Sequence, residues 1–142
     1  MSLGNSAENS LLLLLFNGTA WANIADNAAS GPLTNLYVAW HTADPGEAGS
    51  QTTSETSYTS YDRKAVARTS GGWTVTANSV SPVANIDAPA CTGGTATLTH
   101  FSIGTASSGA GILLVSGTIT PNIAVSSGVT PRLTTTTVIT AD

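Results

Sequence analysis

The chain has 142 residues, of which 41% are hydrophobic and only 8% are charged, and its formal net charge is −4. An ordinary soluble domain has about 25% charged residues, so the hydroxyl groups of 23 Thr and 17 Ser must cover much of this surface, and Thr also favours strands. The four basic residues form no stripe that could neutralise phosphates, so the composition predicts an all-β protein without a nucleic-acid partner.

The first predicted element is a short helix over residues 6–16. Asn5 followed three residues later by Glu8 is a capping box, and Gly18 supplies the stop. The apolar run 11–16 is far shorter than the roughly 20 residues that span a bilayer. Glu8 precedes this run and no Lys or Arg does, which argues against a secretion signal. We therefore expect neither a membrane segment nor a membrane partner.

Apolar side chains surround most of the circumference of this helix, so one face can pack on its own domain while another seeks a partner. On this hypothesis residues 1–35 form a helix and arm, and deletion of residues 1–22 should leave the rest of the chain folded. A helix wholly buried in its own fold is the alternative, and the sequence does not decide between them. The contact residues expected in the arm are Leu12, Leu15, Phe16 and Trp21.

From residue 36 onward the pattern changes to short strands separated by Gly, Pro, Asn and Ser, with an exposed hydroxyl-rich loop at 49–60. The segment 73–77 alternates bulky and hydroxyl residues, and its Trp73 is expected in the core. Strands so spaced predict a β-sandwich or a jelly-roll-like barrel over 36–142. The predicted strands are 36–41, 64–68, 73–77, 83–87, 96–103, 112–120 and 133–140.

The residues that could carry chemistry are few. Cys91 is the only cysteine, which excludes an internal disulfide, and a small buried hydrophobe is its expected role. His41, Asp44 and His100 are the candidates for acid–base chemistry, but no serine stands in a nucleophile elbow and the two histidines lack metal-ligand spacing. We therefore expect a protein that is not an enzyme and holds no metal or cofactor, with histidines bonded to backbone or a loop carboxylate.

Two further groups are candidates for contacts with other proteins. Arg63, Lys64 and Arg68 are close in sequence and predict either a small cationic patch or an edge strand guarded against aggregation. Tyr58 and Tyr61 are suited either to the core or to anchoring an interface.

Several blocks of this sequence resemble a family of small virion proteins of tailed bacteriophages, often labelled tail fibre proteins. The most specific block is LYVAWHTADPGEAG at residues 36–49, and the likeness extends to about residue 120. Trp40 stands where a smaller aliphatic residue is expected. The other blocks are 57–61, 65–68, 72–75 and 90–104.

The resemblance implies a structural protein of the virion, made in the host cytoplasm. Tail fibres usually have long repetitive shaft segments, which this chain lacks, so the expectation is a capsid decoration (cement) protein on the outside of the head. Such a protein would form a homotrimer, bind the major capsid protein and tie capsomers together through avidity. The alternatives are a tail or tail fibre component, and a glycan-binding module, since loops rich in Ser, Thr, Asn and aromatic residues can hold sugars.

Overall fold

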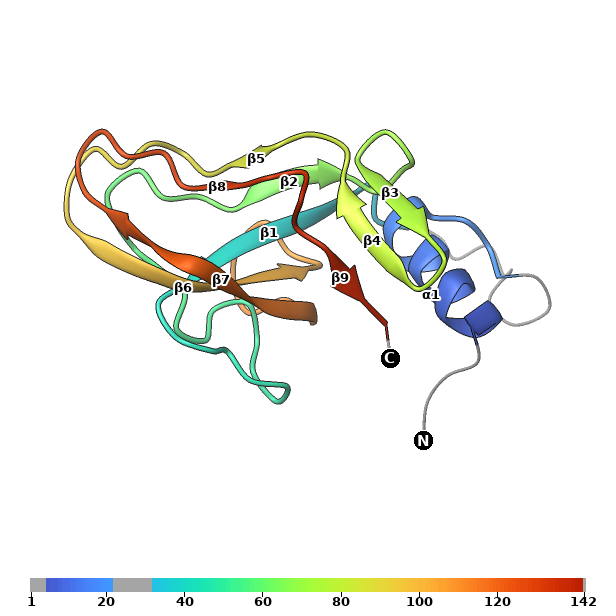
Figure 1. Cartoon of the computed structure of the whole chain (residues 1–142). Coiled ribbons are helices and arrows are strands. Elements are labelled where there is room, and N and C mark those ends of the chain that lie inside the picture. The colour runs from blue at the N-terminus through green and yellow to red at the C-terminus, as the bar shows by residue number, and fades with distance from the viewer. Residues whose placement is uncertain (1–4, 22–31, 142) are drawn as a thin grey trace. The chain divides into compact units, whose positions relative to one another are not determined.

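The computed structural model describes residues 5–21 and 32–141 and contains one helix and nine strands in these ranges (Figure 1). The predicted all-β class with a short N-terminal helix is therefore confirmed. The elements in chain order are α1 (Asn5–Asn17), β1 (Asn35–His41), β2 (Lys64–Ala67), β3 (Trp73–Thr76), β4 (Ser79–Pro82), β5 (Ile86–Asp87), β6 (Ala96–Gly104), β7 (Leu113–Val125), β8 (Arg132–Leu133) and β9 (Ile139–Thr140).

The chain is organised as two units, unit 1 and unit 2. Unit 1 consists of the described residues of 1–35, 67–85 and 134–142, and unit 2 consists of 36–66 and 86–133. The predicted division into an arm over 1–35 and a sandwich domain over 36–142 stays a prediction; in the structure, two later segments, 67–85 and 134–142, belong to the same unit as the helix. Parts of the predicted arm, residues 1–4 and 22–31, lie outside the described residues.

Unit 1 is built from α1 and an antiparallel sheet of order β3-β4-β9. Leu12 and Phe16 lie four residues apart on one face of α1 and are 3% and 0% exposed. The Phe16 ring meets the Trp73 ring edge to face, with centroids 5.0 Å apart and an interplanar angle of 70°. Leu12 and Phe16 are thus core residues of their own unit, which corrects their assignment to a contact with a partner, and the predicted core position of Trp73 is confirmed.

The C-terminal end of α1 is capped by a side chain from the second segment of unit 1. The Arg68 guanidinium donates through Nε to the carbonyl of Leu15 at 2.7 Å and through Nη2 to the carbonyl of Leu14. These carbonyls belong to the last turn of a helix, where they have no partner within the helix and where a cation is favoured. Arg68 therefore belongs to the helix cap and not to a cationic patch with its sequence neighbours.

Unit 2 contains a four-stranded sheet of order β2-β1-β6-β7 and a separate pair, β5-β8. The central strands β1 and β6 are antiparallel, with Val38 opposite Ile103 and Trp40 opposite Phe101. These four side chains are at most 5% exposed and form the core of the unit. On β7, Gly117 leaves space for the Phe101 ring, since a Cβ there would lie 2.8 Å from the ring atom Cε1.

Candidate functional site

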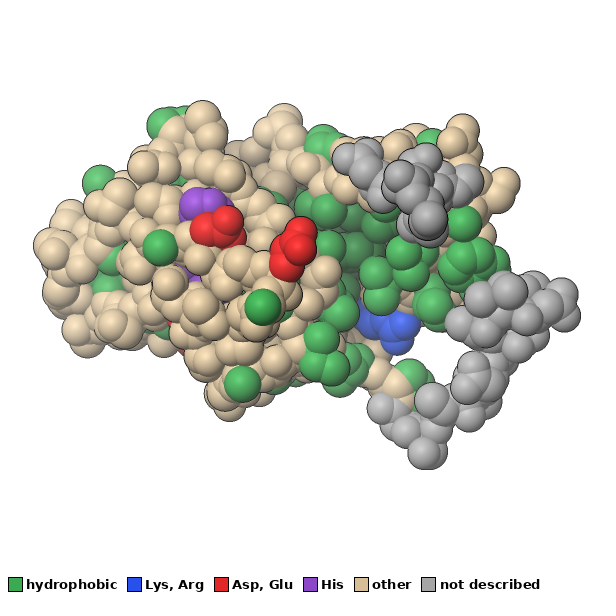
Figure 2. Space-filling view, turned by 90° about the horizontal axis from the view of Figure 1, so that it is seen from below, with side chains coloured by type: hydrophobic (Ala, Val, Ile, Leu, Met, Phe, Trp, Pro, Cys, Tyr) green, Lys and Arg blue, Asp and Glu red, His purple; other side chains and the backbone are tan. Residues whose placement is uncertain are grey.

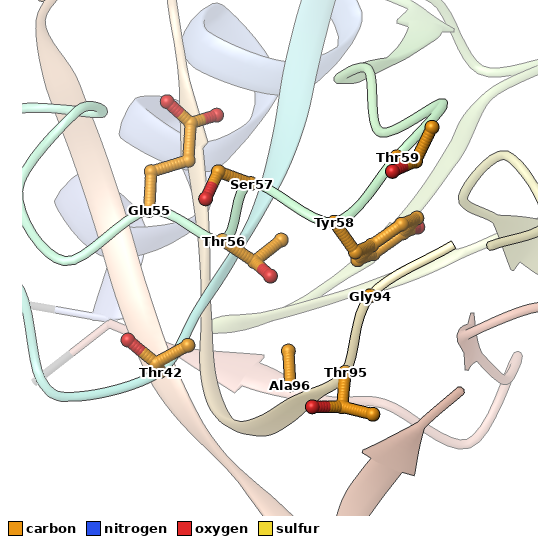
Figure 3. A pocket seen from close by; sticks show the side chains of 9 residues that line it. All are labelled: Thr42, Glu55, Thr56, Ser57, Tyr58, Thr59, Gly94, Thr95 and Ala96. Carbon is orange, nitrogen blue, oxygen red and sulfur yellow. The ribbon is translucent and has the colours of Figure 1, made fainter. Parts of the chain in front are cut away.

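A cavity of about 280 Å³ lies in unit 2, bounded by the loop after β1 and by the start of β6 (Figure 3). We call it the Thr56 cavity. Most of its lining side chains carry a hydroxyl group, one is aromatic and one is a carboxylate. The lining residues are Thr42, Glu55, Thr56, Ser57, Tyr58, Thr59, Gly94, Thr95 and Ala96.

The two walls of the Thr56 cavity are joined by hydrogen bonds. The backbone of Thr59 donates to the carbonyl of Gly93 at 2.9 Å and accepts from the amide of Thr92 at 3.1 Å, which forms an isolated β-bridge. The Tyr58 hydroxyl donates to the carbonyl of Pro89 at 2.7 Å. Burial raises the pKa of Tyr58 to about 12, so this hydroxyl remains a donor at neutral pH and the walls stay tied together.

Thr56 lies in the wall of the cavity and has an unusual environment. Its residue is 4% exposed, and its amide donates to the carbonyl of Trp40 at 2.9 Å. Its hydroxyl oxygen is buried and has no hydrogen-bond partner among the described residues. Figure 3 shows this hydroxyl pointing toward the side of the cavity formed by Gly94 and Ala96. A buried polar group without a partner is costly, and such groups in native structures call for an explanation.

Behind one wall, Glu55 takes part in a buried ion pair. Arg63 Nε donates to Glu55 Oε1 at 2.7 Å and Arg63 Nη2 donates to Glu55 Oε2 at 2.8 Å, and the two side chains are 3% and 14% exposed. The same guanidinium donates to the carbonyls of Ala106 and Gly109 at 2.9 and 2.7 Å. Hydrogen bonding to Glu55 raises the pKa of Arg63. The pair neutralises the one charged group of the cavity and holds the loop at 105–111.

Tyr61 completes this network. Its hydroxyl donates to Glu55 Oε1 at 2.7 Å and accepts from the amide of Trp40 at 3.2 Å. Burial raises the pKa of Tyr61 far above its ordinary range. Its ring packs edge to face on Tyr58, with ring centroids 5.3 Å apart. Tyr58, Tyr61 and Arg63 were candidates for a contact with a partner, and the structure instead engages each of them inside unit 2.

The three remaining contact candidates are more accessible. Leu15 and Trp21 are half-buried in unit 1, and Lys64 is exposed on β2 of unit 2. The sequence-predicted contact residues are therefore divided between the two units. Figure 2 shows that charged side chains are few on the face in view.

The candidates for acid–base chemistry lie in separate environments. His41 Nε2 accepts from Ser102 Oγ at 2.7 Å, and the Nδ1 proton is donated to the carbonyl of Thr53 at 2.8 Å. A serine and a base at this distance match a nucleophile pair, but both residues are 0% exposed. Burial lowers the pKa of His41 and so favours its neutral form. The pair holds β1 against β6, and His41 has the backbone partner that the sequence predicts.

The other two candidates have local partners. Asp44 Oδ1 accepts from the amide of Gly46 at 2.9 Å within a turn, and His100 Nδ1 lies 2.9 Å from the Thr99 hydroxyl. Cys91 is 1% exposed, which confirms its predicted buried position. In residues 5–21 and 32–141, no three His, Cys, Asp or Glu side chains are grouped closely enough to hold a metal ion. No helix of this part of the chain has the length and apolar character needed to cross a membrane.

The sequence did not single out Glu55 and Thr56, because the whole segment 49–60 has the composition of an exposed loop. Within it, Gln51 is 0% exposed and its side chain bonds the carbonyl of Tyr37 at 3.1 Å and the amide of Ala106 at 3.0 Å. The one available signal was the isolated carboxylate of Glu55 among hydroxyl residues.

A comparison with known families gives a match over nearly the whole chain. Residues 2–140 match the family model described as Podophage GP4 fiber I protein gp80. No curated protein matches the chain. The resemblance to tailed-phage virion proteins is confirmed by this match. The chain therefore belongs to the family of podophage GP4 fiber I protein gp80, and it is a structural protein of the phage virion.

Proposed function

We propose that this chain is a fibre subunit of a podophage tail, which acts by binding other virion proteins and not by catalysis. The observation that carries the proposal is the family match over residues 2–140, because the family is described as a fibre protein. The expected decoration of the capsid rested on the lack of a repetitive shaft. The family description favours the fibre alternative over the capsid location.

The sheet of unit 2 offers a surface for such association. Strand β7 lies at one edge of the order β2-β1-β6-β7, and its 13 residues include no charged side chain. Proteins that avoid pairing through an edge strand usually place charges or prolines on it, and Pro121 is the one such residue in β7. An uncharged edge can accept a strand from another chain through backbone hydrogen bonds. We assign this edge to association between copies, for which a homotrimer remains the expected state.

Labelling of intact virions tests the location. A gold-labelled antibody against the chain, viewed on whole particles, should bind at the tail. Quantitative mass spectrometry of purified virions should count far fewer copies of the chain than of the major capsid protein. Label distributed over the head, at an abundance near that of the major capsid protein, would overturn the fibre assignment in favour of capsid decoration.

Light scattering on the purified chain tests the association surface. We expect a trimer mass for the wild type and a monomer mass for the double variant Thr118→Lys/Thr120→Lys, which places two charges on exposed positions of β7. The matched control is Thr74→Lys on an exposed position of β3 in unit 1, which should keep the oligomer. A wild-type monomer, or an oligomer unchanged in the β7 variant, would contradict this part of the proposal.

A further inference from the structure

We propose that β9 is exchanged between copies of this chain, so that the β9 of one copy pairs with the β4 of another. The inference rests on the association between copies proposed above and names a further segment that carries it. It concerns unit 1, whereas the β7 edge belongs to unit 2.

Strand β9 completes one edge of the sheet of order β3-β4-β9. Ile139 lies opposite Val80, which is 1% exposed. Beyond the strand, the Ala141 amide donates to the carbonyl of Asn78 at 2.8 Å, and the Asn78 side-chain amide donates to the carbonyl of Ala141 at 3.3 Å. Each copy therefore needs a strand at this position, and the structure shows that residues 139–141 fit it.

A second copy can supply this strand as well as the chain itself can. A strand of identical sequence would make the same hydrogen bonds and the same contacts with β4. Exchange between identical chains is then decided mainly by the segment that leads into the strand, which turns back within one chain or extends toward another. That segment is 134–138, which begins where the chain leaves unit 2.

The segment 134–138 turns back through residues whose type does not favour a turn. The turn spans 134–137 and is closed by a hydrogen bond from the Thr137 amide to the carbonyl of Thr134 at 3.0 Å. All four of its residues are Thr, whereas turns are dominated by Gly, Pro, Asn, Asp and Ser. Because Thr is branched at Cβ, it prefers extended backbone. The sequence of the turn therefore favours the extended form that exchange requires.

The other hydrogen bonds that hold the turn closed are also exposed to water. The hydroxyl oxygens of Thr134 and Thr136 are 2.6 Å apart, and the Thr135 amide donates to Asn85 Oδ1 at 3.3 Å. All three Thr residues are exposed. Water can replace such bonds when the turn opens, so their net contribution is small. Opening of the turn is therefore a low-cost step.

Two apolar side chains beside the β4-β9 pair face water in a single chain. Val83 directly follows β4 and is 47% exposed, and Val138 directly precedes β9 and is 60% exposed. Where β9 passes from one copy to another, the second copy comes close to both positions. Exchange would therefore give these two side chains a surface on which to pack.

A pair of introduced cysteines tests whether paired β4 and β9 belong to one chain. Ser79 and Thr140 lie opposite each other, and such Cα atoms are about 4.5 to 5.5 Å apart, which suits a disulfide. In a Cys91→Ser background, we expect oxidised Ser79→Cys/Thr140→Cys to run as covalent dimers and trimers on a denaturing gel without reductant. The matched control, Thr74→Cys/Ser81→Cys, joins opposite positions of β3 and β4 and should run as a single chain.

The turn provides a second test that needs no disulfide. Thr135→Asn/Thr136→Gly places Asn-Gly, which favours tight turns, at the centre of the turn and should keep β9 in its own chain. We expect this variant to raise the concentration at which the oligomer dissociates, followed by light scattering, at least tenfold. Ser127→Asn creates the same Asn-Gly pair in the turn at 126–129 of unit 2 and should leave that concentration unchanged.

The outcomes separate this inference from the proposed function. Exchange is refuted if Ser79→Cys/Thr140→Cys closes within single chains, or if Thr135→Asn/Thr136→Gly dissociates at the same concentration as the wild type. Either result with a wild-type oligomer leaves the association of copies standing. A wild-type monomer would refute association and exchange together, and gold labelling of virions would still decide the fibre location.

Discussion

Arg63 offers the sharpest test of how unit 2 is held together. Replacement by Met keeps much of the side-chain volume but removes four hydrogen bonds, two to Glu55 and one each to the carbonyls of Ala106 and Gly109. The Glu55 side chain, 14% exposed, would then be a nearly buried charge without a cation. Breaking a buried pair in this way costs about 3 to 5 kcal/mol, so we expect Arg63→Met to lower the free energy of unfolding of unit 2 by roughly that amount.

The chain contains its own control for this prediction. Arg132 and Asp87 form a pair with similar two-bond geometry, at 2.6 and 2.8 Å, but their side chains are 52% and 39% exposed. Exposed pairs contribute little because water screens them, so Arg132→Met should leave the stability almost unchanged. The indole N–H resonance of Trp40 in unit 2, followed during urea unfolding, measures both variants. A loss below about 1 kcal/mol for Arg63→Met, or equal losses for the two variants, would refute the reasoning.

Three further predictions concern stability. Burial lowers the pKa of His41 below its ordinary 6.5, so on acidification the unfolded chain binds a proton at a higher pH than the folded chain does. The urea midpoint of unit 2 should therefore fall as the pH drops below about 6.5, and His41→Gln should reduce that fall. An equal dependence of the midpoint on pH in the wild type and the variant would contradict this prediction. Phe16→Ala should cost about 3 to 5 kcal/mol in unit 1, measured by the same urea titration on the Trp73 resonance, while Leu33→Ala at a position 43% exposed should cost far less. Gly117→Ala places a Cβ 2.8 Å from the Phe101 ring and should cost about 1 to 3 kcal/mol, and an unchanged denaturation curve would show that the ring moves aside freely.

Local signals in the sequence were sufficient for most of the secondary structure. The capping box at Asn5 and Glu8 and the stop at Gly18 placed the helix within one residue at each end. Strand β4 was missed because its sequence, SVSP, has one aliphatic residue and ends in Pro, although Val80 and Pro82 alternate toward the core. The packing of α1 on the β3-β4 hairpin depends on contacts between residues far apart in sequence. The periodicity of hydrophobic residues along the chain does not predict such contacts.

The basic residues show why proximity in sequence is a poor guide to a shared cationic patch in the fold. Arg63, Lys64 and Arg68 fall within six positions, yet they occupy three environments: a buried ion pair, an exposed strand position and a helix cap. The partners that decide this, Glu55 and the carbonyl of Leu15, are visible only once loops and segments have been brought together. The hydroxyl composition that made the 49–60 segment look solvent-exposed also concealed the buried Thr56.

The division of unit 1 among three separated stretches has a consequence for biosynthesis. The ribosome releases α1 before Trp73 and β4, and it releases β9 later still. Until then the apolar face of the helix has no native surface to cover it, which exposes the nascent polypeptide to unwanted association. A product that ends at residue 133 would contain every residue of unit 2 but lack β9, so termination at that point would damage unit 1, which contains the helix.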